Sequence, residues 1–122
     1  MQNGTTALIT AVRARAIGTA TLLAPLENRL TDVQGFTALM WAEDTESVEM
    51  VQILLEKEAG LQDNEGLTAL MWAAKSNRKS AYILAPYEID KVNNQGKKAS
   101  QLAREAGHNK MADYLEKREQ EA

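Results

Sequence analysis

The sequence has no cysteine, one histidine, two prolines and no long apolar run, and these shortages exclude several classes of protein. Without cysteine there is no disulfide framework, no thiolate zinc site and no cysteine nucleophile. One histidine argues against a histidine-rich metal site and against a histidine-based catalytic triad. No segment approaches the ~20 apolar residues that span a bilayer, and the first residues do not resemble a secretory signal. We therefore expect a cytoplasmic protein that holds no metal or cofactor and does not enter a membrane.

The composition is that of a globular protein. The 122 residues are 44% hydrophobic and 25% charged, with a formal net charge of −3. A chain of this length suits one domain and can bury roughly two thirds of its unfolded surface. A slightly acidic chain is a poor match for nucleic acid or for an anionic membrane. We expect a single domain, residues 1–122, that binds neither.

The chain repeats itself in fixed register. The phrase Gly-x-Thr-Ala-Leu stands at residues 4–8, 35–39 and 66–70, and a weaker form stands at 96–100. The four glycines are 31, 31 and 30 residues apart. Self-similarity at such a period is typical of a repeat array whose units bury their apolar sides against one another. The spacing predicts about four units: 1–34, 35–65, 66–95 and 96–122.

Each unit has room for two short helices. In the second unit the pattern predicts helices at residues 38–44 and 48–58, the latter with apolar residues on one face and charged residues on the other. Thr37 is positioned to cap the first helix, and Gly60 supplies the left-handed residue that ends the second.

A loop joins one unit to the next. Residues 61–66 are expected to form an extended lead-in and a tight turn, for which Asn64 and Gly66 supply the turn chemistry. The third unit is one residue short between its helices, near 76–79, which predicts a local distortion there. The fold class is therefore an all-α solenoid of helix-turn-helix units joined by short hairpin-like loops.

The repeated phrase resembles the ankyrin repeat. The family motif is Gly-x-Thr-Pro-Leu-His-x-Ala, and residues 35–42 and 66–73 read Gly-x-Thr-Ala-Leu-Met-Trp-Ala. The family's later Gly-His pair is intact only at Gly107-His108, where the resemblance implies a structural turn. The resemblance covers nearly the whole chain and implies an ankyrin-repeat solenoid.

Three further phrases narrow the resemblance. Residues 54–66, 23–27 and 84–88 are similar to the expanded ankyrin families of diplomonad protists, some of which carry a NEK-type kinase domain. No glycine-rich phosphate loop, catalytic aspartate loop or kinase lysine motif is present here.

The resemblance implies a partner-binding surface, because ankyrin proteins bind in a concave groove formed by hairpin tips and first helices. The corresponding positions in the second and third units are Val33, Gln34, Phe36, Trp41, Asp44, Thr45, Asn64, Glu65, Leu67, Trp72, Lys75 and Ser76. Those in the flanking units are Asn3, Thr5, Thr10, Arg13, Asn94, Gln95, Lys97 and Glu105.

Among these positions, the two tryptophans give the most specific indication of a binding surface. Trp41 and Trp72 occupy the same slot in neighbouring units, so stacking should place them side by side, with Phe36 and Leu67 edging the same groove. A partly exposed indole is a frequent interface hot spot. The alternative is that both indoles pack between the first helices and only hold the units together.

Charge is divided along the chain. Residues 27–65 carry ten acidic and two basic side chains, and residues 66–110 carry eight basic and three acidic ones. In a linear stack these blocks make the molecule electrically polar along its axis. Such polarity can steer a partner or favour weak head-to-tail self-association, or it can be solvated surface without a role.

The sequence favours a non-enzymatic module that binds a protein partner. Its carboxylate pairs have no predicted pocket to shift their pKa values, so a catalytic role is not supported. The alternative function is a regulatory ankyrin segment of, or in trans to, a signalling enzyme such as a kinase. The identity of the partner is not encoded in these patterns, and we expect a monomer or weak self-association.

Overall fold

The computed structural model describes residues 6–27 and 29–121, which form helices and loops without a strand. The helices of the described residues fall into four successive pairs: α1 (Ala7–Arg13) with α2 (Ile17–Glu27), α3 (Ala38–Asp44) with α4 (Val48–Glu58), α5 (Ala69–Ser76) with α6 (Ser80–Glu88), and α7 (Ala99–Glu105) with α8 (Asn109–Glu121). Both helices predicted for the second unit are confirmed in their bounds.

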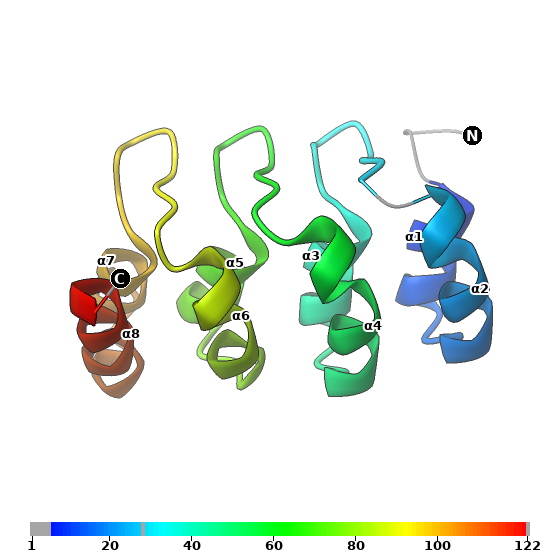
Figure 1. Ribbon diagram of the computed structural model, residues 1–122. Helices are drawn as coiled ribbons and strands as arrows, with labels where there is room; N and C mark the ends of the chain where they lie inside the picture. The colour runs from blue at the N-terminus through cyan, green and yellow to red at the C-terminus, as the bar shows by residue number, and fades with distance from the viewer. Residues whose placement is uncertain (1–5, 28, 122) are drawn as a thin grey trace.

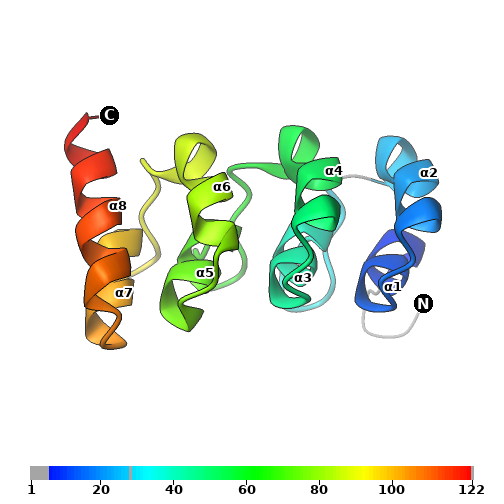
Figure 2. The same ribbon diagram turned by 90° about the horizontal axis from the view of Figure 1, so that it is seen from below.

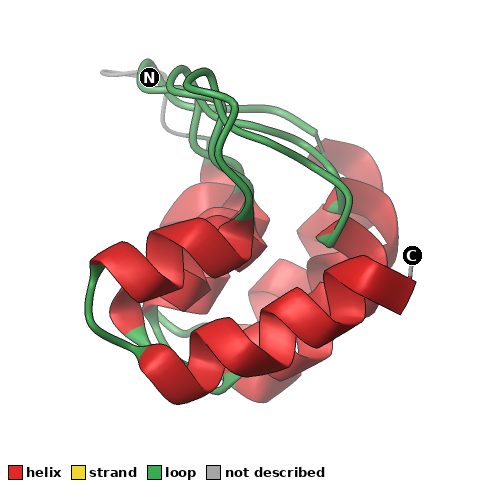
Figure 3. Cartoon of the chain, turned by 90° about the vertical axis from the view of Figure 1, so that its left-hand side faces the viewer, coloured by secondary structure: helices red, strands yellow, loops and turns green. Residues whose placement is uncertain are grey.

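The four pairs stand side by side in one row (Figure 1). Seen from below, the first helices α1, α3, α5 and α7 form one line and the second helices form another (Figure 2). Viewed end on, the connecting loops leave the helices and project together to one side (Figure 3). The predicted all-α solenoid is confirmed.

The first helices begin where the repeated threonine predicts. The side chains of Thr6, Thr37 and Thr68 each accept a hydrogen bond from the backbone N–H three residues later. This bond satisfies one of the orphan donors at a helix N-terminus. Lys98 replaces threonine in the last unit, and there the Gln101 side chain accepts from the Lys98 N–H.

The core lies between the two lines of helices. Leucines and methionines from both lines are fully buried, among them Leu39 on α3, Leu54 on α4 and Leu84 on α6. Alanines at the remaining inner positions let adjacent helices approach closely. Since each helix pair covers its neighbour, the apolar sides of α3 to α6 are shielded from solvent on both flanks.

A glutamate near the end of each second helix fastens it to the start of the first helix of the same unit. Glu27, Glu58, Glu88 and Glu119 accept the backbone N–H of the second residue of the partner helix at 2.7–3.1 Å, and Glu58 and Glu88 are fully buried. Glu58 also accepts the N–H of Arg29 at 2.8 Å, and Glu88 that of Gly60 at 2.8 Å. These two carboxylates therefore join consecutive units. The repeat pattern alone does not predict this contact.

Asn64 and Gly66 lie in the tight turn as predicted, but the side chain that holds the turn is that of Asp63. In the loop at residues 61–66 its Oδ1 accepts the N–H groups of Glu65 and Leu67 at 2.9 Å. Asp32 and Asn93 make the same pair of bonds in the neighbouring loops. Asn64 instead donates through its Nδ2 to the carbonyl of Val33 in the preceding loop at 3.1 Å.

Glycine lets the loops stack at this short distance. Gly35 and Gly66 have φ of +83°, and a Cβ on Gly66 would stand 2.5 Å from the Asn94 Oδ1 atom and 2.6 Å from the Asn94 backbone nitrogen. Gly96 has a similar φ of +76°, but open space surrounds it. The predicted left-handed stop at Gly60, with φ +88°, is also present.

The connection between the helices of the third unit is not short, contrary to the prediction, because residues 77–79 equal residues 45–47 of the second unit in number; the shortening lies in the second helix, where α6 has 9 residues and α4 has 11. Arg15, Glu46, Asn77 and Gly107 all have positive φ and mark equivalent turns, so the missing residue lies after Arg78. Helix α6 consequently begins at Ser80 without a side-chain cap, whereas Ser47 caps α4. The Ser80 hydroxyl oxygen is buried and has no hydrogen-bond partner among the described residues.

Replacing Gly66 by alanine tests the loop stacking, with Gly96→Ala as the matched control. Both variants lose the same free energy because alanine disfavours a left-handed backbone, but only Gly66→Ala places the new Cβ against Asn94. We expect Gly66→Ala to lower the free energy of unfolding by about 1–3 kcal/mol more than Gly96→Ala, measured by urea denaturation. Equal losses would mean that the loops do not pack as closely as described.

Replacing Glu58 by alanine tests the glutamate contact. The variant leaves the N–H groups of Leu39 and Arg29 without their acceptor, so we expect a loss of about 2–4 kcal/mol in the free energy of unfolding. The control is Glu56→Ala, an exposed glutamate on the same helix, which should cost less than ~0.5 kcal/mol. A similar small cost for both would show that the contact contributes little.

Candidate functional site

A row of three aromatic rings lies where hairpin loops meet the first helices. The ring centroid of Phe36 is 5.8 Å from that of Trp41 and 5.8 Å from that of Trp72, at interplanar angles of 84° and 88°. Edge-to-face contacts of this kind are favourable. The two indoles thus lie in neighbouring units, as their shared slot predicts, and Phe36 bridges them.

Each indole is fixed by the loop that directly precedes its helix. The Nε1 of Trp41 donates to Asp32 Oδ2 at 3.1 Å, and the Nε1 of Trp72 donates to Asp63 Oδ2 at 2.9 Å. One aspartate thus shapes the loop with one oxygen and holds the indole with the other. Both rings remain half-exposed, so they combine the two roles that the sequence left open as alternatives, as structural anchors that also present an apolar surface.

Two cations lie over these rings. The guanidinium carbon of Arg13, on α1, is 4.6 Å from the Trp41 ring centroid, and the Nζ of Lys75 is 4.7 Å from the Trp72 centroid. A cation over an indole face is attracted by the ring quadrupole. The aromatic row therefore has positive charge on both flanks.

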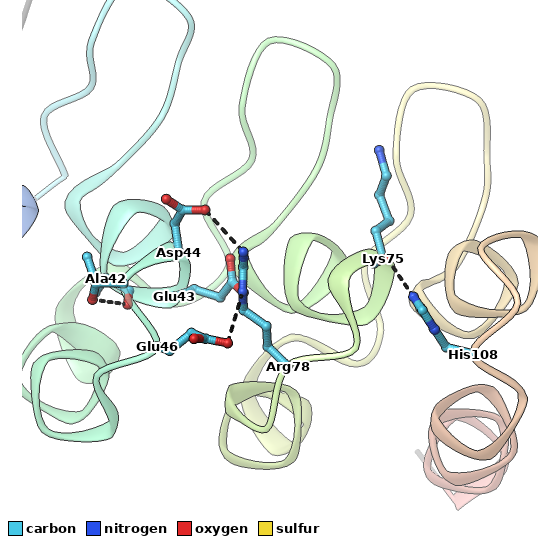
Figure 4. Close-up of polar contacts among 8 residues, drawn as sticks. Ala42, Glu43, Asp44, Glu46, Lys75, Arg78 and His108 are labelled. Atoms are coloured by element: carbon cyan, nitrogen blue, oxygen red, sulfur yellow. Dashed lines mark hydrogen bonds and ion pairs between the residues drawn. The ribbon is translucent and has the colours of Figure 1, made fainter.

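An open cavity of about 270 Å³ lies between the second and third units. Its walls are the three rings together with the following residues: Met40, Glu43, Asp44, Ser76 and Arg78. At its polar end the Nη1 of Arg78 is 3.0 Å from Glu43 Oε1 (Figure 4), and its other nitrogens are 3.4 Å from Asp44 Oδ1 and 3.6 Å from Glu46 Oε1. One guanidinium thus faces three carboxylates.

Glu43 differs from the other members of this cluster because its side chain is 1% exposed. Burial disfavours the ionised carboxylate and raises its pKa from 4.5 to about 7, against the opposing effect of the hydrogen bond and charge of Arg78. Asp44 and Glu46 are mostly exposed and add a smaller upward contribution to the pKa of Glu43. Its equivalents in the first and third units are the apolar Val12 and Ala74.

The Glu43–Arg78 pair was not predicted from the sequence, although the sequence carries one signal for it. Arg78 occupies the position of His108 in the last unit, and each reaches back to the first helix of the preceding unit. His108 Nε2 lies 3.1 Å from the carbonyl oxygen of Lys75 (Figure 4), which fits the structural role that the resemblance implied for it. An arginine at this position together with a glutamate at an apolar position could have indicated the pair.

A second, wider cavity of about 500 Å³ lies between the third and fourth units. Loop residues of both units line it, together with Lys75, Leu102 and Glu105. Lys97 and Glu105 face each other there, with Nζ and Oε2 2.8 Å apart. Like the first cavity, it is framed by hairpin loops and first helices.

The predicted groove residues divide into several groups in the structure. Those that line the first cavity are Phe36, Trp41, Asp44, Trp72 and Ser76, and those that line the second are Asn64, Glu65, Leu67, Asn94, Gln95, Lys75 and Glu105. Exposed Val33 and Gln34 lie on the loop before α3, while Lys97 is half-buried beside Glu105. Asn3 and Thr5 lie outside the described residues. Thr10 is exposed on α1.

Two of the predicted residues serve the structure: one is almost fully buried, and the other is bonded to the end of its own helix. Leu67 is 4% exposed, and the Thr45 hydroxyl donates to the carbonyl of Ala42 at 2.7 Å, where α3 ends. The structure therefore gives both a part in holding the groove together. The role of the whole set in partner binding stays a prediction.

The buried Glu43 predicts how stability depends on pH. Between pH 4.5 and about 7 the folded chain retains a proton that the unfolded chain has released, so the free energy of unfolding should fall as the pH rises through this window. Glu88, whose pKa burial raises to about 7, acts in the same direction.

Glu43→Gln isolates the contribution of Glu43. The difference in free energy of unfolding between this variant and the natural chain should change by about 1–3 kcal/mol between pH ~5.5 and pH ~8, measured by chemical denaturation. Glu46→Gln, at an exposed position, should give a difference that stays constant. A constant difference for Glu43→Gln would show that Glu43 is ionised throughout.

Comparison with known protein families agrees with the row of helix pairs and hairpin loops. The family model for ankyrin repeats (3 copies) matches residues 1–64 and again residues 44–122. No curated protein matches the chain. None of the helices in the described part of the chain is long and apolar enough to cross a membrane, and the described residues contain no group of three or more histidine, cysteine, aspartate or glutamate residues that could hold a metal ion. Ankyrin repeats generally mediate protein–protein interaction and are typically non-catalytic. The two matches together span the sequence, and the chain belongs to the ankyrin-repeat family.

Proposed function

We propose that this chain is a non-enzymatic module that binds a protein partner in the groove between its hairpin loops and its first helices. The observation that carries the proposal is the row of half-exposed Phe36, Trp41 and Trp72 beside an open cavity. Rigid aromatic area with fixed charges nearby is typical of interface hot spots. The cavities are framed by residues that the repeat brings to the same side of the molecule.

Rigidity supports the same proposal. The loop aspartates, the stacked glycines and the buried glutamates hold the groove side chains in place before a partner arrives. Association then loses little conformational entropy on this side of the interface. The size of the first cavity, about 270 Å³, is below the ~300–1,000 Å³ of typical small-molecule sites and suits one side chain of a protein.

Truncating the indoles tests the groove. For a partner captured from the source cell and then purified, Trp41→Ala or Trp72→Ala should weaken binding by about 2 kcal/mol or more, measured by titration calorimetry. Trp72→Phe should weaken it less, because the ring area largely remains. Tyr87→Ala, on the second helix α6 and 53% exposed, is the control on the opposite line of helices and should leave binding unchanged.

Loss of folding must be separated from loss of contact, because each indole also holds its loop. Circular dichroism and urea unfolding of each variant provide that check. If folded indole variants bind normally while Tyr87→Ala loses affinity, the partner binds the second helices and the groove assignment is wrong.

A further inference from the structure

The seventh residue of each first helix carries a charge whose sign alternates along the row. The four equivalent residues, in order of the units, are Arg13, Asp44, Lys75 and Glu105. All four are exposed, and they lie at or next to the ends of helices that form one line (Figure 2). They therefore form a stripe of alternating charge, which we call the charge stripe.

The stripe borders the groove. Asp44 lines the first cavity, and Lys75 and Glu105 line the second. Arg13 and Lys75 lie over the indoles of Trp41 and Trp72, so their charges flank the aromatic row. A molecule that follows the groove from one cavity to the next must pass these side chains.

Each charge of the stripe is held by a contact that a partner could share. Asp44 is 3.4 Å from Arg78, and Glu105 is 2.8 Å from Lys97. Exposed ion pairs contribute little net energy, so adding an opposite charge from a partner does not require a strong bond to break. At Asp44 the balance favours another cation, because Arg78 alone faces the carboxylates of Glu43, Asp44 and Glu46.

The spacing of the stripe suits an extended peptide. Packed helices stand about 8–10 Å apart, and an extended chain advances about 3.3 Å per residue, so neighbouring stripe positions are roughly three residues of peptide apart. We propose that the groove selects an extended peptide segment with an acidic residue, an arginine and an acidic residue at every third position, the arginine lying beside Asp44 over the first cavity.

Arginine fits this cavity for reasons of shape as well as charge. Its planar guanidinium stacks on aromatic rings and pairs with carboxylates in a fixed geometry, whereas lysine offers a point charge. The cavity offers both kinds of surface, three aromatic rings on one side and the carboxylates of Glu43 and Asp44 on the other. The acidic residues on either side then oppose Arg13 and Lys75. This inference rests on the proposed function, since it specifies what the groove binds.

Two peptides of equal composition test the pattern. The matched peptide is Glu-Gly-Gly-Arg-Gly-Gly-Glu, which reads the same in both directions, and the scrambled peptide is Glu-Gly-Gly-Glu-Gly-Gly-Arg. Binding is followed at low salt by the NMR shifts of the indole N–H groups of Trp41 and Trp72, because salt screens exposed charges. We expect the matched peptide to bind about fivefold more tightly than the scrambled one.

Exchanging two charges of the stripe should reverse this preference. The double variant Asp44→Lys with Lys75→Glu keeps the net charge and changes the order of signs to one that fits the scrambled peptide. It should therefore bind the scrambled peptide more tightly, again by about fivefold. Both positions are exposed, and urea unfolding checks that the variant remains folded.

A third peptide, with citrulline in place of the arginine, tests the central position in the natural chain. Citrulline has a similar shape but no charge, so affinity should fall about fivefold. This measurement does not depend on the folding of any variant.

The outcomes separate this inference from the proposed function. Equal binding of matched and scrambled peptides, with shifts at both indoles, would keep the groove as a binding surface and overturn the charge pattern. Absence of binding by the matched peptide would also overturn the pattern, whereas the proposed function is judged separately by the response of the purified partner to the indole variants.

Discussion

The solenoid depends on a carboxylate that is buried where two helices and a loop meet. A helix N-terminus leaves backbone N–H groups without partners, and burying them costs free energy unless an acceptor is supplied. Glu58 and Glu88 supply it to the first helix of their own unit, and they also accept an N–H from the loop that leaves the preceding unit. The same bonds that complete one unit therefore fix its position against the previous one. The cost is a desolvated acid, visible in the upward shift of the pKa of both groups.

The positions of the groove side chains are set by these glutamate contacts and by the helices that they align. Once the first helices are aligned, Asp63 shapes its loop with one oxygen and positions the Trp72 indole with the other. Gly66 then lets the next loop approach closely enough for Asn94 to donate to the Asn64 carbonyl at 3.0 Å. Residues that hold the fold and residues that face a partner are thus neighbours in the same loop. This explains why a partner surface on a repeat protein can be rigid even though much of it consists of loops.

The parts of the structure that recur along the chain could be predicted from it. Thr37 as a cap follows from a phrase that three copies repeat, and the helix bounds of the second unit and the left-handed Gly60 follow from local chemistry. Contacts between units were harder to predict, because a repeat pattern does not show which side chains of different units face each other. The glutamates at 27, 58, 88 and 119 recur at intervals of 31, 30 and 31, yet their role is visible only once the second helix is placed beside the first. The turn at Asn64 and Gly66 was predicted, but the role of the Asp63 side chain in holding it was not, because aspartate and asparagine both suit a turn and only the hydrogen bonds show which side chain holds the loop.

Differences between the copies indicate where selectivity resides. A solenoid needs the same core in every unit, so positions that serve packing converge on leucine and alanine. Glu43 departs from this rule, since a carboxylate stands where the two flanking units hold Val12 and Ala74, and a buried charge is costly unless a partner is provided. Arg78 provides that partner from the next unit, which turns an unfavourable substitution into a polar contact specific to one junction. Because this junction also contains the aromatic row and an open cavity, the departure from the repeat and the surface suited to a partner coincide, and the second and third units are the part of the chain where binding should be sought first.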